Sequence, residues 1–172
     1  YAHKHPMMSL SNSYSLEEIS DFIQRAKKSV GEAIEFVCEL KYDGVAISVE
    51  YRDGKLFRAL TRGDGSKGDD VTSNVRTINT IPLVLKGDDY PVSFEIRGEI
   101  MLTHEKFLAL NERILKDGKE PYANPRNTAS GTLKLLNSKE VAKRGLSCFL
   151  YGVYADRPIA NTHFQSIEHA AK

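Results

Sequence analysis

The sequence has little of several features that would point to a class of protein. Its two cysteines, Cys38 and Cys148, lie in apolar alternating runs and form no metal-ligand pair. We therefore expect buried, reduced thiols, with no disulfide and no structural zinc. No apolar run approaches the roughly 20 residues that a membrane span needs, and no signal-peptide hydrophobic region opens the sequence. These absences predict a soluble, cytoplasmic protein.

The chain also lacks an excess of charge of one sign. Its 24 Lys and Arg residues face 23 Asp and Glu residues, which gives a formal net charge of +1. Any contact with nucleic acid therefore depends on local clusters of basic residues. No internal repeat or low-complexity segment is present, and the 172 residues have 41% hydrophobic content. Such a composition is typical of one compact globular domain.

The periodic segments predict an α+β fold of antiparallel sheets with flanking helices. Helical spacing predicts an amphipathic helix over 16–30, opened by a capping box of Ser15 and Glu18. Asp53-Gly54 is a strong two-residue hairpin signal between strands at 45–51 and 55–61. The other expected strands are 34–41, 92–97 and 146–154. A short helix is expected near 71–78, and further helices are expected over 104–116, 128–136 and 139–143 and from 162 onward.

Lys41 is the candidate nucleophile. It ends the alternating run 34–41 and is followed by Tyr42-Asp43-Gly44. A lysine amine attacks only when neutral, so a catalytic lysine needs partial desolvation or nearby positive charge, and a strand end can supply a half-buried pocket. A lysine at a strand end more often simply faces water. From this stretch alone, the solvent-facing interpretation is favoured.

Other charged residues also lie at expected strand ends or in loops marked by glycine or proline. Arg62 opens the glycine-rich loop 61–70, Glu99 is expected at a strand end, and Arg126 lies in a turn-rich loop before a helix of small residues. Arg126 and Lys134 could both face an anion near the start of that helix. A nucleophilic lysine accompanied by acids and arginines suits phosphoryl-group chemistry.

Lys41-Tyr42-Asp43-Gly44 resembles the lysine-x-aspartate-glycine motif of covalent nucleotidyltransferases, which include DNA and RNA ligases and messenger-RNA capping enzymes. Further segments resemble, in the same order, the adenylation domain of bacterial NAD-dependent DNA ligases. They are 5–10, Cys38-Glu39, 61–65, 71–78, Arg97-Gly98-Glu99 and 123–127. The resemblance covers nearly the whole chain and implies part of an ATP-grasp-like nucleotidyltransferase domain.

The resemblance implies that Lys41 attacks the α-phosphorus of NAD, expels nicotinamide mononucleotide and carries AMP. The AMP would pass to the 5′-phosphate of nicked double-stranded DNA, and the 3′-hydroxyl would displace it. Asp43 would assist the lysine through Mg²⁺ or Mn²⁺. The remaining implied roles are adenine binding by Glu39, ribose binding by Arg62 and Glu99, lining of the nucleotide site by Ser9 and Leu10, and phosphate or DNA contact by Arg126 and Lys134.

The sequence departs from the family pattern in two respects. Position 134 is lysine where the family usually has arginine, which replaces a bidentate phosphate contact by a point charge. The later aspartate-glycine-valine-valine-x-lysine strand and a further lysine are absent, as are the upstream small domain and the downstream parts that would bind zinc. We therefore expect a lead-in over 1–12, a partial adenylation domain over 13–172, and weak activity or none for these residues alone.

Two alternatives remain open from the sequence. An ATP-dependent ligase or capping enzyme would share the lysine motif, although the loops 61–65 and 123–127 favour the NAD-dependent type. A non-catalytic module that binds a nucleotide or DNA would need no competent lysine. For the NAD-dependent ligase, a monomer is expected.

Overall fold

The computed structural model describes residues 1–31 and 33–171. The chain divides into two compact units, one formed by Tyr1–Met7 together with the chain from Lys41 onward, the other by Met8–Leu40. Each unit is described by itself. The first seven residues thus belong to the larger unit, and we call them the strap.

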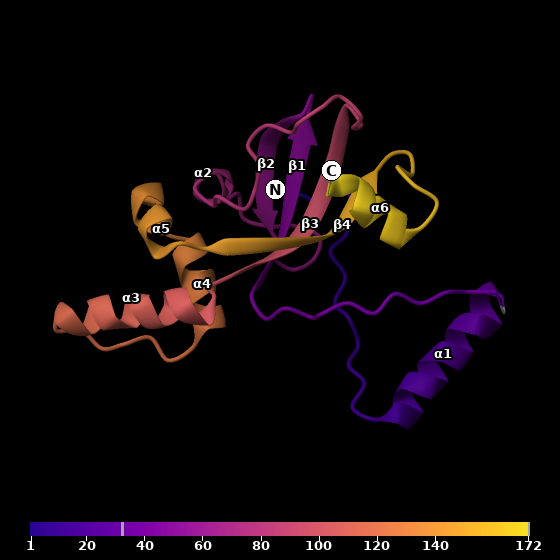
Figure 1. Ribbon diagram of the computed structural model, residues 1–172, viewed down its shortest axis with the longest axis horizontal. Coiled ribbons are helices and arrows are strands. Elements are labelled where there is room, and N and C mark those ends of the chain that lie inside the picture. Colours follow the sequence, from indigo (N-terminus) through magenta and orange to yellow (C-terminus); the bar gives the residue numbers. More distant parts are fainter. Residues whose placement is uncertain (32, 172) are drawn as a thin grey trace. The chain divides into compact units, whose positions relative to one another are not determined.

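In the described part of the smaller unit, Leu16–Val30 forms helix α1 (Figure 1). Its bounds confirm the predicted helix. The hydroxyl of Ser15 accepts a hydrogen bond from the backbone N–H of Glu18, as in a capping box. The Glu18 carboxylate, however, accepts from the backbone N–H of Tyr14 and not from that of Ser15. The capping box is therefore formed in one direction only.

The predicted strand over 34–41 is wrong. Residues 33–43 have no strand pairing, and Cys38 is exposed, where the sequence predicted a buried thiol. An alternating run becomes a strand only where a neighbouring strand accepts its hydrogen bonds. None of the four described strands pairs with this segment.

The larger unit is built on a four-stranded antiparallel sheet in the order β2-β1-β3-β4 (Figure 1). The strands are β1 Val45–Arg52, β2 Lys55–Thr61, β3 Ser93–Met101 and β4 Ser147–Ala155. Asp53 and Gly54 join β1 to β2 with φ angles of 47° and 68°. Two positive φ angles are those of a type I′ turn, so the predicted hairpin is confirmed.

The described helices of the larger unit lie close to the predicted positions. The bounds are α2 Thr72–Val75, α3 His104–Lys116, α4 Pro125–Leu133, α5 Ser138–Arg144 and α6 His163–Ala170. Helix α4 starts three residues earlier than the predicted 128–136, because the Asn124 side chain accepts from the Asn127 N–H and Pro125 occupies the first helical position. No helix in the described chain is long and apolar enough to cross a membrane.

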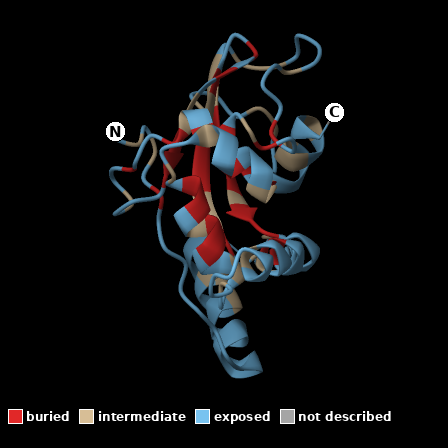
Figure 2. Cartoon of the chain, turned by 90° about the vertical axis from the view of Figure 1, so that its left-hand side faces the viewer, coloured by how far each residue is buried: buried red, intermediate tan, exposed pale blue. Residues whose placement is uncertain are grey.

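One face of the sheet packs on these helices and forms the core. Figure 2 shows the buried residues concentrated in the strands and the adjoining helical segments. Ile47, Val49 and Ile100 are fully buried. They share a cluster of buried residues with helical residues from four elements, Val75, Phe107, Leu133 and Val141. Helix α6 lies beside β4.

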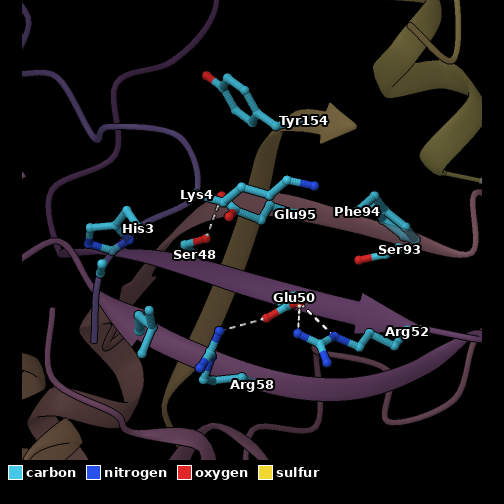
Figure 3. A pocket seen from close by; sticks show the side chains of 12 residues that line it. His3, Lys4, Ser48, Glu50, Arg52, Arg58, Ser93, Phe94, Glu95 and Tyr154 are labelled. Atoms are coloured by element: carbon cyan, nitrogen blue, oxygen red, sulfur yellow. Dashed lines mark hydrogen bonds and ion pairs between the residues drawn. The ribbon is translucent and has the colours of Figure 1, made fainter. Parts of the chain in front are cut away.

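The opposite face of the sheet is polar, yet part of it is also buried. Ser48, Glu95 and Arg97 are each less than a tenth exposed. A cavity of about 300 Å³ lies on this face. Figure 3 shows the side chains that line it: the Ser48 hydroxyl donates to Glu95, and the Glu50 carboxylate lies between Arg52 and Arg58. Buried polar groups of this kind need partners, which the strap supplies in part.

Candidate active site

The segment from Lys41 to Gly44 leads directly into β1, and Gly44 lies close to β3. The Gly44 N–H donates to Glu99 Oε1 at 3.1 Å. A side-chain Cβ at Gly44 would overlap the backbone carbonyl oxygen of Ile100. Glycine is therefore required for this close approach. Lys41 itself is exposed, so the described residues do not form the half-buried pocket expected around it.

Glu99 connects the segment from Lys41 to Gly44 with β3. The sequence placed it at a strand end, whereas β3 continues to Met101, so Glu99 is an interior strand residue paired with Ala46 and Phe149. Burial raises the pKa of its carboxyl group, opposed by the Gly44 N–H and by the charges of Lys41 and Arg126. Glu99 is thus within electrostatic reach of the lysine.

Arg126 completes the grouping from a distant part of the chain. It lies in the first turn of α4, and its Nη1 atom is 2.9 Å from Asp43 Oδ1. Both side chains are more than half exposed, so a ligand could reach either of them. The fold therefore brings together Lys41, Asp43, Glu99 and Arg126, as a site for charged groups would require.

Arg62 lies near this group, whereas Lys134 lies at the opposite end of α4 from Arg126, so the two do not face one anion at the start of that helix as predicted. Thr61 on β2 pairs with Ile47 on β1, and Ile47 pairs with Gly98 on β3. The next residue after Thr61, Arg62, is therefore level with Glu99, and the backbones of Arg62 and Glu99 are two strand spacings, or about 10 Å, apart. Lys134 ends α4, and its Nζ atom is 2.9 Å from Asp69 Oδ2. This contact lowers the pKa of the Asp69 carboxyl group.

The other three predicted site residues belong to the smaller unit. Ser9, Leu10 and Glu39 lie within Met8–Leu40 and are all exposed. They are described within that unit alone, so their assignment to the site stays a prediction from the sequence.

Aromatic side chains near Glu99 were missed by the sequence reasoning. The rings of Tyr42 and Phe149 stack with centroids 4.2 Å apart and planes 5° from parallel. Burial and the nearby Glu99 charge raise the pKa of Tyr151. Alternation along 146–154 puts Phe149 and Tyr151 on the same face of the strand. Only the pairing of β4 with β3 shows that this part of β4 lies beside Glu99. The register of that pairing shifts between Arg97 and Gly98, which the sequence pattern does not reveal.

Comparison with known proteins decides the family. A model of the family described as the NAD-dependent DNA ligase adenylation domain matches residues 1–172. The chain belongs to this family. Proteins named DNA ligase from Bacteroides fragilis, Christiangramia forsetii and Phocaeicola vulgatus are 55%, 52% and 51% identical to it over 99% of its length. The adenylation-domain chain spans 26% of the length of each of these curated relatives.

The described residues of this adenylation domain do not form a recognisable metal-binding cluster by themselves. No three His, Cys, Asp or Glu side chains in the described ranges 1–31 and 33–171 are placed to hold a metal ion. Asp43 nevertheless offers a carboxylate next to Lys41. Mg²⁺ is commonly held by one or two carboxylates together with substrate phosphates and waters, so the donor set fits Mg²⁺ once a phosphate is present.

Proposed function

We propose that this chain carries the nucleotide-accepting lysine of an NAD-dependent DNA ligase. The observation that supports the proposal best is the grouping of Lys41 with Asp43, Glu99 and Arg126. In the first step the neutral Lys41 Nζ attacks the α-phosphorus of NAD. A P–N bond forms, the bond from phosphorus to the bridging pyrophosphate oxygen breaks, and nicotinamide mononucleotide leaves with the electron pair. The attacking nitrogen releases one proton to solvent as the phosphoramidate forms.

The acidic and basic groups would divide the work of this step. Transfer at phosphorus depends mainly on positioning and charge neutralisation, because the transition state spreads negative charge over the phosphoryl oxygens. Arg126 would turn from Asp43 toward the phosphates, and Lys134 would contact phosphate or DNA. Asp43 would then hold Mg²⁺ against the same phosphates, where the metal supplies positive charge.

The remaining residues would hold the nucleoside. In this proposal Glu99 and Arg62 bind the ribose and neighbouring groups, Glu39 binds adenine, and Ser9 and Leu10 line the site. The stacked rings of Tyr42 and Phe149 give this end of the sheet a flat apolar surface beside Glu99. Such surfaces favour contact with a base or sugar over contact with free phosphate.

The second and third steps would use nicked double-stranded DNA. AMP passes from Lys41 to the 5′-phosphate, and the 3′-hydroxyl then attacks that phosphate and releases AMP. These steps and the metal requirement are proposed for the longer protein, as are a monomeric state and a cytoplasmic location. For the 172 residues alone we expect little or no turnover.

The proposal is tested by the covalent adduct. The full-length protein carrying this chain is incubated with NAD or ATP, and intact mass shows whether one AMP is attached. We expect an adduct with NAD and release of nicotinamide mononucleotide, and no adduct in Lys41→Ala. Lys55→Ala, which changes an exposed lysine at the start of β2, serves as the control. A normal adduct in Lys41→Ala would refute the role of the lysine.

The same experiment tests the alternatives. Release of pyrophosphate from ATP would indicate the ATP-dependent type, which the family match disfavours. Binding of AMP without any adduct in the wild-type protein would indicate a non-catalytic nucleotide-binding module.

A further inference from the structure

Arg97 is a buried charge whose nearest carboxylate is shared. It lies two residues before Glu99 on the polar face of β3 and is 6% exposed. Its Nη2 atom is 3.7 Å from Glu95 Oε2, an oxygen that also accepts a hydrogen bond from Ser48. Burying a guanidinium is unfavourable unless its donors are satisfied. Arg97 therefore needs further acceptors.

Those acceptors are two successive carbonyl groups of the strap. Arg97 Nη2 donates to the carbonyl of His5 at 2.6 Å, and Nη1 donates to the carbonyl of Pro6 at 3.1 Å. The guanidinium also lies 4.0 Å from the centre of the Tyr154 ring. Two parallel donors on neighbouring acceptors require the rigid fork of arginine, which lysine does not have.

The strap is held on its other side by the loop that contains Arg62. The Met7 N–H donates to the Gly65 carbonyl at 2.8 Å, and the Met7 side chain is buried. The ring Nε2 of His3 lies 3.1 Å from the carbonyl oxygen of Arg62. The strap thus joins the Arg97 side chain to the backbone of the Arg62 loop.

The strap and the Arg62 loop are joined at more than one point of their backbones. Besides the Met7 contact, the His3 N–H donates to the Ser66 carbonyl at 2.9 Å. A displacement of the strap would therefore disturb the Arg62 loop.

We propose that Arg97 is a positioning residue for NAD binding. This inference rests on the proposed function. In this proposal Arg97 acts without touching the nucleotide: it fixes residues 5–7 against the sheet and so places the Arg62 loop. Arg62 is the residue assigned to the ribose and not to the reacting phosphorus. Loss of Arg97 should therefore weaken NAD binding much more than it slows the transfer itself.

The test measures the rate of covalent AMP attachment against NAD concentration in the full-length protein. Arg97→Met should raise the NAD concentration for half-maximal rate at least tenfold and leave the maximal rate within about threefold. Arg97→Lys should resemble Arg97→Met, because one ammonium cannot replace the fork. The matched control is Arg113→Met: Arg113 Nη2 donates to the Lys143 carbonyl at 3.3 Å, away from the strap, and its loss should change neither value.

Single-turnover sealing separates positioning from general damage. Arg97→Met loaded with AMP by excess NAD should seal a nick within about threefold of the wild-type rate, because the nucleotide is already attached. Unchanged NAD dependence, or slow sealing by the loaded variant, would overturn the proposal.

Thermal melting and a second variant, Tyr154→Leu, distinguish a loss of positioning from a failure to fold. If thermal melting shows that Arg97→Met does not fold, Tyr154→Leu replaces it; this variant removes the ring against the guanidinium and should raise the half-maximal NAD concentration about threefold. An unchanged value in Tyr154→Leu would then count against the proposal. Absence of an adduct in the wild-type protein would contradict the proposed function instead.

Discussion

The two faces of the four-stranded sheet are both partly buried, but different side chains are buried on each. Along β3, Ile96 and Ile100 point into the core, while Glu95 and Arg97 are buried on the other face. Burial on the first face follows from the hydrophobic effect. Burial of charged groups on the second costs free energy, so the polar face indicates a role other than stability. Neighbouring residues of one strand thus serve different purposes.

The largest effect should come from the core face. Ile100→Ala removes a fully buried side chain and leaves a cavity, so the free energy of unfolding should fall by about 2–5 kcal/mol. Urea denaturation measures the change. Glu99→Gln, at the next position along β3, is the control and should alter stability far less. Equal losses in the two variants would contradict the division between the faces.

The next effect should appear where the lysine segment crosses β3. Gly44→Ala would push residues 41–43 away from the Ile100 carbonyl and disturb the Gly44 hydrogen bond to Glu99. Because a displacement of about 1 Å can slow a reaction about 100-fold, AMP attachment should slow by about that factor. Gly131→Ala places a Cβ in open space within α4 and should stabilise the protein by about 0.5–1 kcal/mol. A normal attachment rate in Gly44→Ala would show that this close approach is unimportant.

A smaller effect should appear in the pH dependence of stability. Because burial raises the pKa of Glu99, the native state binds that proton more tightly than the unfolded state. The wild-type protein should therefore lose stability as pH rises from the ordinary value of 4.5 through the native pKa. Glu99→Gln lacks this loss, so its stability relative to the wild type should rise over the same range in urea denaturation. A constant difference from pH 4 to pH 7 would be inconsistent with a desolvated carboxylate.

The smallest effect should come from an exposed ion pair that belongs to neither face. Lys134→Ala removes the partner of Asp69, so the pKa of Asp69 should return toward 3.8, as an NMR titration would show. In the wild type, the contribution of this pair is present above pH 3.8 and is lost as pH falls through the lowered pKa. Lys139→Ala is the control. An unaltered Asp69 titration would mean that the contact is not maintained in solution.

Features with local causes could be predicted from the sequence. The Asp53-Gly54 turn and the helix over 16–30 depend on residues close together in the chain, and the structure confirms both. The family could also be predicted, because the motif around Lys41 is accompanied by further segments in the expected order.

Features that depend on distant pairing could not be predicted. The run 34–41 alternates correctly but has no strand beside it, and Glu99 proved to be an interior strand residue. The contact of Asp43 with Arg126 joins residues 83 positions apart, and those of Arg97 with the strap span 91 and 92 positions. Side-chain chemistry suggested which residues belong to the candidate site, whereas only the fold shows which of them touch.

The division of the chain also affects how freely its length can vary. Residues Met8–Leu40 leave the larger unit after Met7 and rejoin it at Lys41, so they form a loop whose two ends are held by the same folded unit. The entropy of closing such a loop grows only with the logarithm of its length, by about 0.6 kcal/mol for each doubling. A few inserted or deleted residues in this segment should therefore hardly change the stability of the sheet that carries Lys41.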